Sequence, residues 1–186
     1  MQKLPMNDFN RDMKKVKAFY EVVSANFPEF FHGTVIDACS GNGLLGWYVL
    51  SQHHDMKVIA IDKKETEKAK QYRALFPDAE HQYAFQQIDI TKQPLPEADA
   101  LVALHACGTL TDMLMEHAMK EHMPFAIMPC CYSKDRHYFP GNGGFAFQEQ
   151  ITHERLLFAR GQYADVKLLH IDDAITPMNA ILGGVA

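Results

Sequence analysis

Hydrophobic and polar positions form two different patterns along this chain. In residues 11–26 apolar side chains recur at a spacing near 3.6, which predicts an amphipathic helix that ends before Pro28. Beyond it, short apolar runs alternate with segments of helical pattern, as is typical of βαβ units and a parallel sheet. The predicted strands are 34–38, 57–61, 83–88, 100–104, 125–128, 165–171 and 180–182, and the predicted helices are 44–51, 64–75, 110–121 and 148–160.

The same pattern predicts one domain over residues 1–186, because it contains no internal repeat, low-complexity segment or interdomain linker. Within it, residues 1–33 are expected to form a helical cover and 34–186 the α/β core. The 186 residues are 47% hydrophobic and 22% charged, so they bury a core without disulfides or a structural metal. Glycine and proline concentrate in 139–144, which predicts a mobile loop.

Membrane and export signals are not found. The sequence has no run of about 18 apolar residues, and its first 17 residues are polar and charged. A cytoplasmic protein with no membrane partner is therefore expected. In that setting its four cysteines are expected to be thiols or ligands and not disulfide partners.

Charge is divided unevenly along the chain, whose net charge is −5. Residues 1–73 carry a net +2 and residues 74–186 a net −7. This balance argues against a strongly electrostatic nucleic-acid binder, and DNA is not an expected partner. RNA stays open, and if it binds, its phosphates are expected to meet the basic residues Lys14, Lys17, Lys134 and Arg136.

A glycine-rich segment follows the first predicted strand. Gly41, Gly43 and Gly46 match the GxGxxG spacing of dinucleotide-binding loops, which indicates an NAD-dependent oxidoreductase as one interpretation. Asp37 competes with it, because a carboxylate at the end of the strand repels a pyrophosphate and holds an ammonium group. Asp62 ends the second predicted strand and Asp89 the third. The ligand is therefore expected to carry a positive end group.

The pattern Asp37-x-Cys39-x-Gly41-x-Gly43 resembles the first motif of class I S-adenosylmethionine-dependent methyltransferases, with Cys39 where the first glycine is usual. The resemblance implies a Rossmann-like three-layer αβα fold with a mostly parallel seven-stranded sheet whose last two strands form an antiparallel pair. It also implies the cofactor S-adenosyl-L-methionine, with Asp37 at its amino end, Asp62 at its ribose and Asp89 at its adenine. The residues expected to bind the cofactor are Asp37, Cys39, Gly41, Gly43, Asp62, Lys63, Asp89, Ile90 and His105.

Two further patches follow the fourth and fifth predicted strands. They read LHACGTLTD over 104–112 and MPCCYSK over 128–134, and they resemble a methyltransferase subfamily that includes a tRNA ribose 2′-O-methyltransferase. The resemblance implies methyl transfer to RNA, either tRNA or rRNA. The candidate catalytic residues are His105, Cys107, Cys131 and Tyr132.

Each of these residues has a second interpretation. His105 is either a general base or a structural histidine, and Tyr132 and Phe139 either stack on a base or close the core. Thr109-x-x-Asp112 reads either as a capping box or as part of the catalytic site.

The cysteines have three interpretations. They are buried structural thiols, a nucleophile at Cys107 or Cys131, or metal ligands. Metal ligands are the least favoured because Cys130-Cys131 and His105-x-Cys107 lack the CxxC spacing of zinc sites, and no metal is expected. A non-catalytic cofactor-binding protein also stays open.

Overall fold

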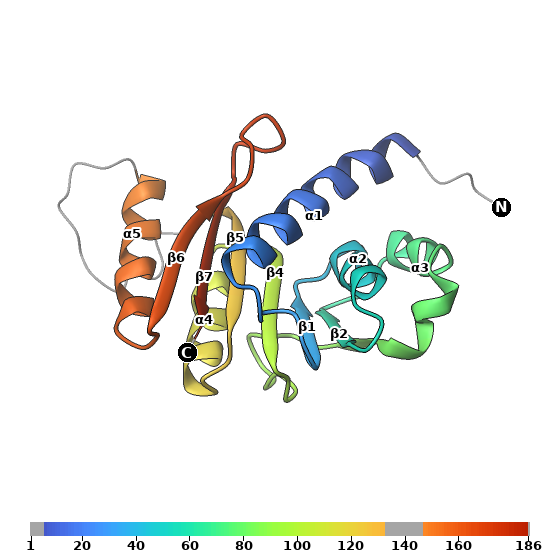
Figure 1. The fold of residues 1–186 in the computed structure, drawn as a ribbon, viewed down its shortest axis with the longest axis horizontal. Helices are drawn as coiled ribbons and strands as arrows, with labels where there is room; N and C mark the ends of the chain where they lie inside the picture. The colour runs from blue at the N-terminus through green and yellow to red at the C-terminus, as the bar shows by residue number, and fades with distance from the viewer. Residues whose placement is uncertain (1–5, 133–146, 186) are drawn as a thin grey trace.

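The computed structural model describes residues 6–132 and 147–185 (Figure 1). The predicted loop at 139–144, with Lys134, Arg136 and Phe139, lies outside them. In chain order the elements are α1 (Met6–Asn26), β1 (Thr34–Ala38), α2 (Leu44–Gln52), β2 (Lys57–Asp62), α3 (Glu67–Arg73), the 3₁₀ helix η1 (Pro77–Gln82), β3 (Tyr83–Gln87), β4 (Ala100–Cys107), α4 (Leu110–Lys120), β5 (Phe125–Cys131), α5 (Phe147–Arg160), β6 (Asp165–His170) and β7 (Ala180–Val185).

The strands form one seven-stranded sheet in the order β3-β2-β1-β4-β5-β7-β6. The pairs from β3 to β5 are parallel, whereas β7 is antiparallel to both β5 and β6. This confirms the predicted Rossmann-like sheet with its antiparallel pair. The strand order reverses between β1 and β4, and ligands of open α/β sheets bind at such a switch point, beyond the carboxyl ends of the strands.

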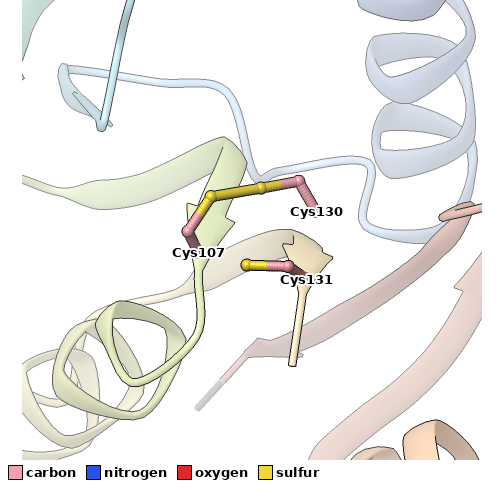
Figure 2. Close-up of side chains that lie close together, drawn as sticks. All are labelled: Cys107, Cys130 and Cys131. Carbon is pink, nitrogen blue, oxygen red and sulfur yellow. A yellow bond between two sulfur atoms is a disulfide. The ribbon is translucent and has the colours of Figure 1, made fainter. Parts of the chain in front are cut away.

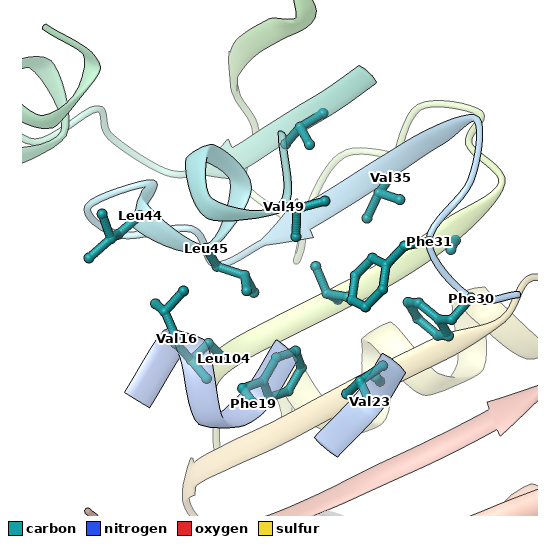
Figure 3. Close-up of a cluster of buried hydrophobic side chains, with 14 of the residues drawn as sticks. Val16, Phe19, Val23, Phe30, Phe31, Val35, Leu44, Leu45, Val49 and Leu104 are labelled. Atoms are coloured by element: carbon teal, nitrogen blue, oxygen red, sulfur yellow. The ribbon is translucent and has the colours of Figure 1, made fainter. Parts of the chain in front are cut away.

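Two hydrophobic clusters cover the two faces of the sheet. Neighbouring residues of one strand divide between them, so that Val35 packs in one cluster and Ile36 in the other. The first cluster contains Val16, Phe19 and Val23 of α1, which face α2 and Leu104 of β4 (Figure 3). The second contains residues of α4 and α5. The sheet is therefore the middle of three layers, with α1 and α2 on one side and α4 and α5 on the other.

The central strands are longer than predicted. β4 and β5 each continue three residues beyond the apolar runs, as far as Cys107 and Cys131. The first residues of the patches expected to follow these strands are therefore the last residues of the strands, because main-chain pairing continues where the apolar pattern stops. Between Pro77 and Gln82 the chain forms a 3₁₀ helix that the pattern did not predict.

In the part of the chain that the structure describes, no helix is both long enough and apolar enough to span a membrane.

Candidate active site

A cavity of about 470 Å³ opens at the carboxyl ends of β1, β2 and β4, next to α1. This volume falls in the range of small-molecule sites. Its lining consists of Asp12, Lys15, Val16, Asp37, Cys39, Ser40, Gly41, Asn42, Leu45, Asp62, Lys63, Ile88, Ile90, Leu104, His105, Cys107 and Leu110. Of the residues expected to bind a cofactor, the fold brings all but Gly43 and Asp89 to this lining.

The loop between β1 and α2 forms one wall of the cavity. Three of its residues have left-handed backbone, with φ of 55° at Cys39, 56° at Gly41 and 70° at Gly43. Cys39 thus adopts the conformation that glycine adopts most easily. A Cβ built on Gly41 would meet nothing nearer than the Cys39 carbonyl oxygen at 3.9 Å, so space stays open at this point of the loop.

Asp62 fixes this loop from the end of β2. Its Oδ2 accepts a hydrogen bond of 2.9 Å from the Gly41 amide, and the Ser40 amide donates to the Ile61 carbonyl at 3.0 Å. On the far side the Thr66 hydroxyl donates to the Gly41 carbonyl at 3.2 Å. Asp62 therefore has a structural partner in the protein while its side chain also faces the cavity.

Asp37 is the buried acid of the site. Its side chain accepts a hydrogen bond of 3.1 Å from the Gly46 amide in the first turn of α2. Burial raises the pKa of Asp37 to about 7; the Gly46 hydrogen bond opposes this shift, and the negative charge of Asp62 adds to it. A cation bound in the cavity would favour the ionised form, so the carboxyl group is suited to an ammonium ligand.

The other two glycines of the loop serve packing. Gly43 is the N-cap of α2, and a Cβ there would collide with the Tyr83 hydroxyl. A Cβ on Gly46 would lie 2.8 Å from Cγ1 of Val58, so glycine lets α2 approach β2 closely. Neither residue lines the cavity. The GxGxxG spacing thus reflects one residue at the cavity and two at the contact between helix and sheet.

Asp89, which was expected to face an adenine, has partners within the protein and is not part of the cavity lining. Its carboxylate accepts from the backbone amide and the hydroxyl of Thr91 and lies 3.4 Å from the Lys63 ammonium. The Thr91 hydroxyl, with Lys63, holds the pKa of Asp89 down at about 2. The residue closes the turn after β3. Its neighbours Ile88 and Ile90 line the cavity in its place.

Helix α1 supplies polar residues that the sequence did not reveal. Asp12 and Lys15 both line the cavity. Asp12 accepts from Lys68 at 2.8 Å and from the Asn42 side-chain amide at 3.0 Å, which ties α1 to α3 and to the glycine loop. The one sequence signal for them is their i, i+3 spacing, which places both on the same face of the helix. That spacing equally suits a solvated helix face.

His105, near the end of β4, presents its ring to the cavity. Burial by neighbouring groups lowers the pKa of His105, and the positive charge of Lys15 lowers it further while Asp12 opposes the shift. A lowered pKa favours the neutral imidazole. A neutral imidazole accepts a proton, which is the property that a general base requires.

The cysteines require a correction. Cys107 and Cys130 form a disulfide across the ends of β4 and β5, whereas thiols or ligands were expected and not disulfide partners (Figure 2). The strand pairing brings their Cα atoms to 5.5 Å, a normal disulfide separation. Cys107 lines the cavity without a free thiolate, and the exposed Cys131 does not line it. Burial raises the pKa of Cys39 to about 12, so it is a thiol and not a nucleophile.

Tyr132 also has a different place from the one expected. Its hydroxyl shares a hydrogen bond of 3.0 Å with Thr152, and its ring centre lies 5.5 Å from the guanidinium carbon of Arg155. It lines a separate hollow beside α5.

The capping box considered for Thr109-x-x-Asp112 is not formed. Thr109 makes no side-chain cap, and Asp112 instead binds Arg155 in the interior. Asp112 of the LHACGTLTD segment and Tyr132 of the PCCY segment therefore both contact α5.

A family model and several curated proteins match this chain. The family described as "Methyltransferase domain" matches residues 11–136. The "Glutathione S-transferase C-terminal domain-containing protein" of Xenopus laevis is 35% identical over 108 residues, which are 53% of this chain and 16% of that protein. The chain thus spans about one sixth of the length of the curated relatives it matches.

Solved structures show the same fold at low identity. Magnesium protoporphyrin IX methyltransferase from Synechocystis PCC 6803, with bound SAH, gives a TM-score of 0.63 at 14% identity over 100% of this chain and 90% of that one. An O-methyltransferase family protein from Burkholderia thailandensis gives 0.61 at 17% identity over 96% and 59%.

Proposed function

Because the chain belongs to the methyltransferase domain family, we propose that it transfers a methyl group from S-adenosylmethionine to RNA in the cavity beside α1. The family assignment sets aside the oxidoreductase interpretation of the glycine loop. One observation supports this cofactor: Asp62 accepts a hydrogen bond of 2.9 Å from the Gly41 amide at the cavity, and the buried Asp37 lines the same cavity.

The charges of the cavity suit this cofactor. S-adenosylmethionine supplies a methyl group activated by a positively charged sulfonium, and it carries an ammonium group. Asp37 and Asp62 both line the cavity, so a cationic ligand is attracted where a pyrophosphate would be repelled. Gly41 leaves room above its backbone, and Ile88 and Ile90 give an apolar wall suited to a flat ring.

His105 is the residue best placed to act on the acceptor. It lies in the same cavity and its lowered pKa favours the neutral ring, so it can take the proton of a ribose hydroxyl as the hydroxyl attacks. Burial lowers the pKa of the ring, and the charge of Lys15 lowers it further. Methyl transfer is an in-line displacement, so the other residues of the site contribute by holding donor and acceptor in line.

The lysines of α1 support RNA as the acceptor. Lys14 and Lys17 are exposed on the helix whose Lys15 lines the cavity, so phosphates at the cavity mouth would meet positive charge. The basic residues of α3 are already engaged, Lys68 by Asp12 and Lys70 by Glu67. RNA contact is therefore assigned to α1.

Binding and turnover test the two parts of the proposal separately. Titration calorimetry with S-adenosylmethionine, S-adenosylhomocysteine and NAD should show micromolar binding of the two sulfur compounds and none of NAD. Incubation with a methyl-labelled donor and total RNA should then label RNA in a form that ribonuclease releases. Cofactor binding without transfer to any RNA fraction would favour the non-catalytic binding protein.

A charge reversal at the proposed RNA contact sharpens the test. Lys14→Glu with Lys17→Glu should reduce methylation of RNA and leave cofactor affinity unchanged. Lys57→Glu is the control. Lys57 is an exposed lysine at the amino-terminal end of β2, whereas the cavity lies at the carboxyl ends of the strands. Equal losses in both variants would contradict the assignment of RNA contact to α1.

A further inference from the structure

Three cysteine sulfurs gather where β4 and β5 end. The Sγ atoms of Cys107, Cys130 and Cys131 all lie within 4.8 Å of one another. In Figure 2 the Cys131 sulfur points toward Cys107, beside the disulfide. Cys107 and Cys131 are exposed and Cys130 is half-buried, so solvent reaches the group. Neither the fold nor the proposed methyl transfer requires three sulfurs at one place.

A break in the strand register brings them together. Between the pairs Ala103–Ile127 and Ala106–Pro129, β4 has one extra residue. Between Ala106–Pro129 and Cys107–Cys131, β5 has one extra residue, at Cys130. In a regular strand, Cys130 and Cys131 would point to opposite faces. The extra residue is a β-bulge, which re-aims side chains and commonly lies next to active sites. Two consecutive cysteines thereby reach the same partner.

We propose that these three sulfurs, once reduced, bind one zinc ion. Thiolates bind zinc at about 2.3 Å in a tetrahedron, which places two sulfurs about 3.8 Å apart. The three sulfurs lie within 4.8 Å of one another, so rotation of the side chains about their Cα–Cβ bonds can bring Cys131 to that distance, while the two sulfurs of the reduced disulfide move apart to it. Soft thiolate ligands select zinc over magnesium or calcium. The strand register thus replaces the CxxC spacing whose absence argued against a metal in the sequence.

The ion would keep one open position. Within residues 6–132 and 147–185, no further cysteine, histidine or carboxylate joins the three sulfurs. Three protein ligands with an open fourth position are the arrangement of catalytic zinc, which binds water or a substrate group there. Because Cys107 also lines the cavity, the ion would lie at its edge. The inference does not depend on methyl transfer.

The disulfide and the zinc site exclude each other. A dithiol reductant passes two electrons and two protons to the Cys107–Cys130 bond, giving two thiols and the oxidised form of the reductant. Zinc then replaces the protons of the three thiols and releases three protons to solvent. The oxidised protein is therefore expected to bind no zinc at this place.

Metal titration of the full chain tests the site without an activity assay. Protein reduced with a phosphine should take up one equivalent of Co²⁺ with thiolate-to-cobalt charge-transfer absorption, and Zn²⁺ should displace it. C107S, C130S and C131S should each weaken Zn²⁺ binding by more than about 100-fold, since losing an outer-shell partner alone costs 10- to 100-fold. C39S is the matched control and should bind like the wild type.

A second measurement uses the wild-type protein, in case a variant does not fold. Alkylation of the reduced protein, read by peptide mass spectrometry, should be slowed by Zn²⁺ at the three clustered cysteines and not at Cys39. The proposal is overturned if the reduced protein takes up no equivalent of metal, if C131S binds as tightly as C39S, or if Zn²⁺ protects none of the three.

Discussion

Arg155 of α5 donates two parallel hydrogen bonds to the Asp112 carboxylate of α4, from Nε to Oδ1 at 2.7 Å and from Nη2 to Oδ2 at 3.1 Å. Both side chains are almost fully buried, with 1% and 3% exposed. Nη2 also donates to the Gly108 carbonyl at 3.0 Å. The pair therefore joins two helices on one face of the sheet to the turn that follows β4.

Breaking this pair on one side should cost much of the stability of the protein. Asp112→Ala leaves a buried guanidinium without its partner, and we expect a loss of about 3–5 kcal/mol in the free energy of unfolding, measured by urea denaturation. Replacing both residues, as in Asp112→Leu with Arg155→Met, should recover part of that loss.

The exposed pair of Glu67 and Lys70 provides the control. Its ammonium–carboxylate contact of 2.7 Å joins side chains that are 82% and 52% exposed. Glu67→Ala should leave the unfolding midpoint unchanged, because solvent screens such pairs. If Asp112→Ala were as mild as Glu67→Ala, the Arg155 contact would not be a determinant of stability.

Cys39 holds a left-handed conformation that glycine adopts without strain. Cys39→Gly should therefore change the free energy of unfolding by less than about 1 kcal/mol, because relief of strain offsets the greater chain entropy of glycine. Cys39→Val should lower it by about 2 kcal/mol or more, since a branched Cβ fits poorly at positive φ. Thermal unfolding of the two variants in parallel gives the comparison. Equal stability of both would show that backbone strain at this position is negligible.

The hydrophobic pattern was sufficient to predict the strands and the α-helices, since strands buried on both faces leave continuous apolar runs. It failed where pairing continued without apolar residues, at Cys107 and Cys131. The glycine loop was predictable because left-handed backbone restricts the residue type.

Contacts between distant segments left no such local signal. Nothing near Asp112 in the sequence indicates Arg155, which follows it by 43 residues, and one extra residue in β5 determines where Cys130 points. Likewise, the helical spacing of α1 does not distinguish a solvated face from one that borders a cavity. In each of these cases the position of the side chain depends on how distant segments of the chain pack or pair, which the local sequence does not show.

The pKa of Asp37 gives a pH dependence of stability. The carboxyl group has a pKa of about 7 in the folded protein against an ordinary 3.8, so folding takes up a proton between these values. Stability from this group is complete below about pH 3.8 and is lost as the pH rises through about 7. Asp37→Asn cannot ionise, so ligand-free Asp37→Asn should melt above the wild type at about pH 8.5 and close to it at about pH 4. A constant difference across this range would contradict the shifted pKa.

Cofactor binding should change in the opposite sense at the same residue. The ionised Asp37 attracts an ammonium group, so wild-type affinity for S-adenosylhomocysteine should rise as the pH increases through about 7. Calorimetry of Asp37→Asn should show weaker binding and a flatter profile over the same interval. If the variant binds as tightly as the wild type at about pH 8.5, Asp37 does not contact the charged end of the cofactor.

Gly41 and Gly43 should respond differently to alanine. Both have positive φ, but only at Gly43 would a Cβ collide with the Tyr83 hydroxyl. Gly43→Ala should destabilise the protein by about 1–3 kcal/mol, with part of the loss recovered by adding Tyr83→Phe. Gly41→Ala should destabilise less and weaken cofactor binding more, because its side chain would enter open space at the cavity. Calorimetry and thermal melts on the same preparations separate the two effects.

If His105 is the general base, its replacement should act on turnover and not on cofactor affinity. His105→Gln should lower kcat by about 10²- to 10⁴-fold while the Kd for S-adenosylhomocysteine stays near that of the wild type. The lowered pKa of His105 predicts that wild-type activity falls only below about pH 6.5. Removing the charge of Lys15 with Lys15→Met should raise that pKa and move the acid limb to higher pH, whereas Lys57→Met should not. An acid limb that stays in place in Lys15→Met would assign proton removal to another group.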